Sequence, residues 1–175
     1  MTSIIVAIIL DELFLMNGWI DWLKKIGIFS FVPTLCLIIL DKYIWKIPFI
    51  NCCLFQLPNL NGDWKGYYSR QNDEGHHSLT LKITQTLSNI HIRSISKNSE
   101  GKSISIDLIR NEFNEVKLVY VWESKHNSLI HHEIKEHMYG LSILGLIDNN
   151  TLSGDYFTNR TPQTKGKSVF KRERI

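Results

Sequence analysis

The sequence changes character near residue 58, and this change constrains the fold more than any other feature. Residues 1–57 hold 38 apolar residues, and the remaining 118 residues also hold 38. The first segment carries four lysines and four acids, whereas the rest carries 16 lysines and arginines, 13 acids and all seven histidines. A single uniform globular domain is therefore excluded. A disordered chain is excluded too, because aliphatic and aromatic residues are too frequent.

The apolar segment contains one long uncharged stretch. Residues 26–40 form an uncharged run of 15 residues, and the apolar pattern resumes after Lys42 until Pro48. A helix over residues 26–47 would cross a hydrocarbon core of roughly 30 Å at about 1.5 Å per residue. The lysines at its end would reach the interface. We therefore predict a membrane-spanning helix over residues 26–47.

A second apolar stretch precedes it and is interrupted by adjacent acids. Residues 3–23 are apolar except for Asp11, Glu12 and a few polar positions. A charge at a helix centre costs about 2.5–3.5 kcal/mol on insertion scales, so these acids face protein or the interface. We predict a spanning or re-entrant helix over residues 3–23 and a turn at 24–27 or slightly earlier. The predicted domains are a transmembrane hairpin (1–50), a linker (51–60) and a β-domain (61–175).

Period-two alternation dominates the chain after residue 61. Apolar and polar residues alternate in short runs separated by turn signals such as Asn98-Ser99-Glu100-Gly101. Eight such strands joined in sequence favour an antiparallel up-and-down sheet that closes on itself as an eight-stranded β-barrel. A β-sandwich is the alternative. The predicted strands are 64–69, 79–84, 90–93, 104–108, 116–122, 139–143, 152–158 and 167–172.

Catalytic and metal motifs are absent from the sequence. Cys36, Cys52 and Cys53 are an odd number without zinc spacing. His132 and His137 are five positions apart, which does not fit the His-Glu-x-x-His pattern. No nucleophile elbow or phosphate-binding glycine loop occurs. We therefore expect no enzyme activity, no metal and no cofactor, and the net charge of +3 is too small to indicate DNA or RNA binding.

One strand-to-loop stretch combines the groups that a nucleotide ligand needs. Tyr156 can stack on a base, Thr158 and Asn159 can bond a base edge or ribose, and Arg160 can bind phosphate. Tyr156 and Thr158 share one strand face. The same residues would also suit an ordinary strand end with a solvated arginine.

Several segments together resemble a known family. The matching segments follow two apolar helices and are Asp41-Lys42-Tyr43-Ile44-Trp45-Lys46-Ile47-Pro48, Asn59-Leu60-Asn61-Gly62-Asp63-Trp64-Lys65-Gly66-Tyr67, Ile83-Thr84-Gln85-Thr86, Leu152-Ser153-Gly154-Asp155-Tyr156-Phe157-Thr158-Asn159-Arg160 and Gly166-Lys167-Ser168-Val169-Phe170-Lys171-Arg172. Over essentially its whole length the chain resembles the two-transmembrane β-barrel effectors of bacterial CBASS anti-phage systems, the CD-NTase-associated family, and the resemblance implies a minimal lipocalin-like barrel.

The resemblance implies a mechanism without catalysis or metal. A partner nucleotidyltransferase of the CD-NTase type makes a cyclic dinucleotide, which the cytoplasmic barrel binds. Binding promotes self-association of the membrane helices, disruption of the inner membrane and abortive-infection cell death. The ligand residues implied by resemblance and chemistry are Tyr156, Thr158, Asn159 and Arg160, with Tyr67 and Gln85 as second choices. Asp11 and Glu12 would then act in the membrane or in the oligomer, or their segment inserts only shallowly.

Other function classes remain open on the sequence alone. A membrane-anchored lipocalin-like carrier of an apolar ligand would need a roomy barrel lined by Leu81, Ile106 and Leu118. A structural or interaction module would have a filled barrel, and a membrane-bound hydrolase is the most distant alternative. Lysines lie at both ends of the predicted second helix, so charge does not fix the orientation in the membrane.

Overall fold

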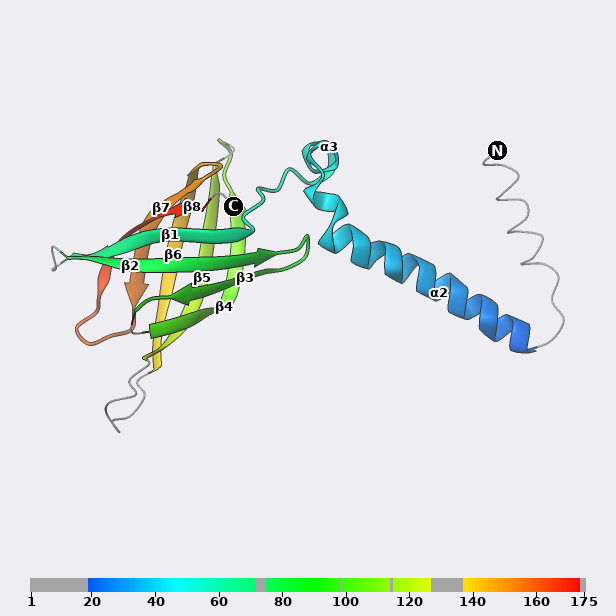
Figure 1. Ribbon diagram of the computed structural model, residues 1–175, viewed down its shortest axis with the longest axis horizontal. Helices are drawn as coiled ribbons and strands as arrows, with labels where there is room; N and C mark the ends of the chain where they lie inside the picture. Colours follow the sequence, from blue (N-terminus) through cyan, green and yellow to red (C-terminus); the bar gives the residue numbers. More distant parts are fainter. Residues whose placement is uncertain (1–18, 72–74, 98, 114, 127–136, 174–175) are drawn as a thin grey trace. The chain divides into compact units, whose positions relative to one another are not determined.

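The computed structural model describes residues 19–71, 75–97, 99–113, 115–126 and 137–173 (Figure 1). The chain divides into two compact units, Met1–Phe55 and Gln56–Ile175. The boundary lies inside the segment predicted as a linker, 51–60. Each unit is described by itself below.

The first unit is helical in its described part. Helix α2 runs over Trp19–Lys42 and contains Pro33. The short elements that follow are η1 (Ile44–Lys46), α3 (Pro48–Ile50) and η2 (Asn51–Phe55). Where side chains of α2 are described, exposed apolar residues recur from Ile26 to Ile39, with Phe29 68%, Phe31 66% and Leu37 64% exposed.

The predicted hairpin is corrected in two respects. The turn expected at residues 24–27 or slightly earlier is wrong, because α2 begins at Trp19 and continues through these residues. Lys24 and Lys25 favour helix, and the single Gly27 costs only about 1 kcal/mol relative to alanine. Among the described residues, no helix combines the length and apolar character required to cross a membrane, so the predicted membrane hairpin is not found there. The uncharged run 26–40 is shorter than the roughly 20 residues of a typical span. Most of the first predicted helix, including Asp11 and Glu12, lies outside the described residues.

The second unit is a closed barrel of eight strands in sequential order, each antiparallel to its neighbours (Figure 1). This confirms the predicted up-and-down barrel and excludes the sandwich. The strands are β1 (Gly62–Arg70), β2 (His76–Gln85), β3 (Ile90–Ile95), β4 (Ser99–Arg110), β5 (Val116–His126), β6 (His137–Asp148), β7 (Thr151–Thr158) and β8 (Lys165–Arg172).

The barrel interior is divided into a filled half and a hollow half. The filled end is where β1 begins and β2 ends, and the open end is where β1 ends at Arg70 and β2 begins at His76. Large apolar side chains pack in the filled half, because every second residue of each strand points inward. The buried core cluster consists of Leu60, Trp64, Leu81, Ile83, Ile92, Leu118, Tyr120, Leu144, Leu152 and Phe170.

The segment that leads into β1 seals the filled end. The Trp64 indole Nε1 donates to the Leu60 carbonyl oxygen at 2.9 Å. The Gln85 Oε1 accepts from the Leu60 amide at 2.7 Å, and its Nε2 donates to the Pro58 carbonyl at 3.1 Å. The Arg172 guanidinium lies 4.8 Å from the centre of the Trp64 ring. The chain therefore enters the barrel at its filled end.

Candidate ligand-binding site

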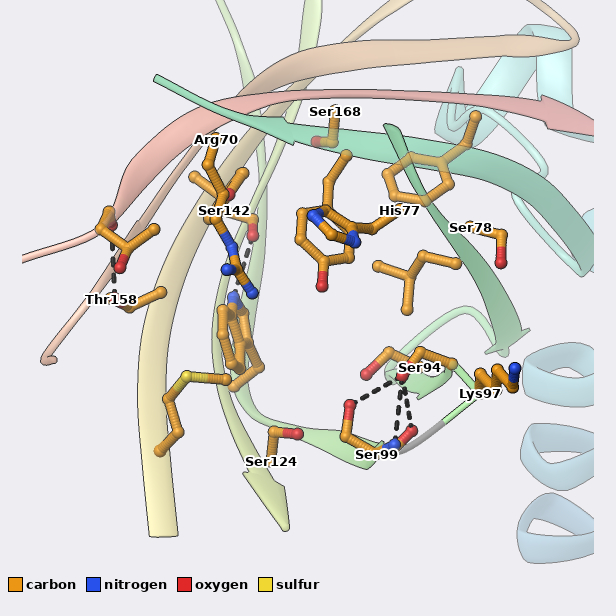
Figure 2. A pocket seen from close by; sticks show the side chains of 18 of the residues that line it. Arg70, His77, Ser78, Ser94, Lys97, Ser99, Ser124, Ser142, Thr158 and Ser168 are labelled. Carbon is orange, nitrogen blue, oxygen red and sulfur yellow. Dashed lines mark hydrogen bonds between the residues drawn. The ribbon is translucent and has the colours of Figure 1, made fainter. Parts of the chain in front are cut away.

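A cavity of about 510 Å³ occupies the open half of the barrel (Figure 2). Its walls combine hydroxyl, aromatic and cationic side chains from β1 to β8 and from the connections at the open end. The lining residues are Tyr68, Arg70, His76, His77, Ser78, Leu79, Ser94, Ser96, Lys97, Ser99, Tyr120, Trp122, Ser124, Met138, Ser142, Tyr156, Thr158, Arg160, Thr164, Ser168 and Phe170.

Small residues at inward positions explain why this half is hollow. The filled half has the inward pair Leu118 and Leu144 on β5 and β6, whereas the next inward positions of β6 toward the open end are Ser142 and Gly140. A Cβ atom at Gly140 would lie 2.2 Å from the Trp122 ring. Only glycine therefore leaves room for the indole across the inner wall, where its Nε1 donates to the Ser142 Oγ at 2.9 Å.

Aromatic rings form one side of the cavity. Tyr68 stacks on His77 with ring centroids 5.0 Å apart, and it meets Tyr156 edge-to-face at 5.6 Å. Burial raises the pKa of Tyr156, and the nearby Arg70 cation opposes part of that rise. Burial raises the pKa of Tyr120 to about 12. Both phenols are therefore neutral at physiological pH and can donate hydrogen bonds.

Hydroxyl groups form most of the remaining wall (Figure 2). The Ser96 and Ser99 Oγ atoms are 2.8 Å apart, at the turn between β3 and β4. On the opposite side, Thr158 Oγ1 donates to the Thr164 carbonyl at 3.3 Å. A hydroxyl both donates and accepts, so this wall suits a ligand with many polar atoms.

The charges of the lining have one sign. Arg70, half-buried at the end of β1, reaches into the cavity, and the exposed Lys97 lies farther out (Figure 2). Arg160, also exposed, is a third cation of the lining. Among the described lining residues there is no aspartate or glutamate. The cavity therefore favours an anionic ligand, and the guanidinium groups are suited to bidentate binding of phosphate.

Three of the sequence-predicted ligand residues line the cavity. Tyr156 and Thr158 are both buried and point inward from β7, as their shared strand face predicted. Arg160 lies two residues beyond the end of β7.

The other three predicted residues lie elsewhere. Tyr67 points outward, is 44% exposed and packs on His76 with ring centroids 4.7 Å apart. The Asn159 Oδ1 accepts from the Tyr139 amide at 2.9 Å, so this side chain ties β6 to the end of β7. Gln85 is buried at the filled end, in the seal described above. Asp11 and Glu12, predicted to act in the membrane, lie outside the described residues.

Sequence reasoning missed Arg70, Tyr68 and Trp122. Strand alternation contained the signal, because Tyr68 and Arg70 share parity with the inward Trp64 whereas Tyr67 does not.

The residues required by the apolar-carrier alternative do not line the cavity. Leu81 and Leu118 belong to the packed core, and Ile106 packs against it. Among the described residues, no group of three or more potential ligands could hold a metal ion. Most of the histidine-rich segment 131–137 lies outside those residues.

Comparison with known families and proteins gives one result. The family model described as "Cap15, cyclic dinucleotide receptor domain" matches residues 55–172, which span the whole barrel from its entering segment to the end of β8. No curated protein matches the chain. A closed eight-stranded barrel with a cationic, hydroxyl-lined cavity agrees with this match, and the chain belongs to the Cap15 family through its cyclic dinucleotide receptor domain.

Proposed function

We propose that the chain is an effector of CBASS anti-phage defence whose barrel binds a cyclic dinucleotide in the cavity. Binding drives self-association of the N-terminal units in the bacterial inner membrane. The membrane is then disrupted, and the infected cell dies before the phage matures. The cyclic dinucleotide comes from a cognate nucleotidyltransferase of the CD-NTase type, and the effector itself performs no catalysis.

The composition of the cavity lining is the observation that carries the proposal. A cyclic dinucleotide has two phosphates, two riboses and two bases. Arg70 and Arg160 supply the cations for phosphate, and Tyr68, Tyr156 and Trp122 supply faces for base stacking. Hydroxyl groups are available for ribose and base edges, and no described carboxylate opposes the anion.

The membrane output is supported by the character of the first unit. A helix that is apolar on all sides is expected inside protein or lipid. The exposed apolar residues of α2 fit lipid, and charged residues near both ends of the run 26–40 would lie at the interfaces. Lys24 and Lys25 before the run and Lys42 after it can reach toward the headgroups and so lengthen the part of the helix that fits in the bilayer.

Activation requires a difference in ligand affinity between two states. The ligand shifts the population toward the assembled state only if it binds that state more tightly. A change from 1:99 to 99:1 needs about a 10⁴-fold preference. Connections at the open end, with Lys97 and Thr164, form part of the cavity wall, so a ligand that contacts them can favour one of their conformations.

A cell-based experiment tests the proposal. Cells that carry the chain and its cognate synthase are infected, and entry of propidium iodide is followed beside growth. We expect dye entry with the wild type and with Lys171→Ala, which changes an exposed residue of β8 outside the cavity. Cells that carry Arg70→Ala should exclude the dye after infection, although the variant protein stays in the membrane fraction. Growth arrest of wild-type cells with an intact membrane would contradict the proposal.

A further inference from the structure

Two large apolar side chains are presented to solvent at the filled end of the barrel. Phe113, in the turn between β4 and β5, is 85% exposed, and Ile147, before the turn between β6 and β7, is 70% exposed. Ile109, near the end of β4, is 47% exposed. Single exposed apolar residues are ordinary, but a group at one end of a domain indicates an interaction surface.

The β4–β5 turn fixes the position of Phe113, and a register shift fixes that of Ile147. The Asn111 Oδ1 accepts from the Phe113 amide at 3.0 Å and from the Glu115 amide at 2.8 Å. The Asn111 amide donates to the Glu115 carbonyl at 3.1 Å. Ile147 lies where the register between β6 and β7 shifts, so it has no partner residue in the ladder. These hydrogen bonds and the register shift keep the two side chains turned away from the barrel core.

The two turns are neighbours because β5 pairs with β6. Lys117 lies opposite Gly145 in this pairing, so the end of β6 runs beside the start of β5. Ile109 pairs with Lys117 on the other side of β5. We call Ile109, Phe113 and Ile147 the apolar tip.

The chain enters the barrel beside the apolar tip. Gln56, the first residue of the barrel unit, has a left-handed backbone with φ 52°. The Arg110 guanidinium donates to the Gln56 Oε1 at 3.2 Å and also to the Gln56 carbonyl. Arg110 precedes Phe113 by three residues. The covalent connection to the apolar N-terminal unit therefore leaves the barrel next to the apolar tip.

We infer that the apolar tip docks on a lipid bilayer surface, with Phe113 and Ile147 inserted among the headgroups. This inference rests on the proposed membrane location of residues 1–55. A phenylalanine and an isoleucine gain favourable burial at such an interface. Three acids, Glu112, Glu115 and Asp148, and two cations, Arg110 and Lys117, flank the tip, so it has no excess of positive charge and no preference for anionic over zwitterionic lipids.

Docking has a consequence for ligand entry. The cavity lies at the opposite end of the barrel from the apolar tip. A barrel docked by its filled end therefore opens its cavity toward the aqueous phase. A charged cyclic dinucleotide can then enter directly from the cytosol.

Lipid-quenching of a fluorophore tests the inference on the full chain in vesicles of phosphatidylcholine and phosphatidylethanolamine. The native cysteines are replaced by serine, and bimane is attached to single cysteines introduced by Phe113→Cys, Ile147→Cys or Gln163→Cys. Gln163, in the exposed connection between β7 and β8 at the open end, is the matched control. A fourth variant keeps only the native Cys36 in α2.

We expect headgroup-proximal doxyl lipids to quench the labels at 113 and 147 several-fold more than the label at 163. Equal quenching at all three barrel positions overturns the inference. If Cys36 is quenched in that case, the membrane location stands and only the docking fails. If Cys36 is not quenched, the membrane location fails with it. Quenching at 113 that appears only after phosphatidylglycerol is added would assign the contact to basic residues and would also overturn the inference.

Discussion

Arg70 is the residue on which ligand affinity should depend most. Its guanidinium is half-buried at the end of β1 and reaches into a cavity without described carboxylates. A hydrogen bond to a charged group contributes about 1.5–3 kcal/mol, so Arg70→Ala should weaken cyclic dinucleotide binding by roughly 10- to 150-fold. Arg160 is exposed, where an ion pair contributes about 0.2–1 kcal/mol, and Arg160→Ala should cost only about 1.5- to 5-fold.

Calorimetric titration of the full chain measures both losses. Arg70→Lys keeps the charge but loses bidentate geometry, so its affinity should lie between those of the wild type and Arg70→Ala. Lys171→Ala, on the outer face of β8, should bind as the wild type does. Affinity of Arg70→Ala within about twofold of the wild type would refute the assignment of Arg70 to phosphate. A larger loss for Arg160→Ala than for Arg70→Ala would refute the argument from burial.

Three further predictions concern the barrel itself. Gln85→Leu leaves the Leu60 amide unsatisfied, so urea unfolding should show a loss of about 1–3 kcal/mol in stability with unchanged ligand affinity; equal stability would contradict this. Gly140→Ala should displace the Trp122 ring, seen as a change in tryptophan emission and weaker ligand binding. Burial raises the pKa of Tyr120 to about 12 from its usual 10, so the unfolded chain ionises first. Stability should therefore fall between about pH 10 and about pH 11, by roughly 1 kcal/mol more than in Tyr120→Phe.

The barrel could be predicted from the sequence because each strand carries its own signal. Alternation of apolar and polar residues fixed both the strand count and the inward face, as at Tyr156 and Thr158. Sequential strands with short turns left few topologies other than a closed up-and-down barrel. The division into a filled and a hollow half depends on which serines and glycines lie opposite each other on neighbouring strands. These pairs can be identified only when the register of the strands is known.

The helical unit and half of the site were harder to predict for physical reasons. Lys24 and Lys25 suggested a turn, but both residues favour helix, and α2 continues through them. Tyr67 was preferred on chemical grounds, although its parity places it outside the barrel while Arg70 lies inside. Gln85 has the groups to bind a nucleotide, yet its partners are backbone atoms of a segment 25 residues earlier in the chain. Such long-range pairing has no local signal.

The position of the bound ligand tests the central claim most directly. The measurement is a crystallographic difference map of the full chain with the cyclic dinucleotide made by its cognate synthase. We predict one ligand inside the open half of the barrel, with a phosphate at Arg70 and a base against Tyr68, Tyr156 or Trp122. A ligand bound outside the barrel, or a cavity that stays empty at saturating ligand, would contradict the account.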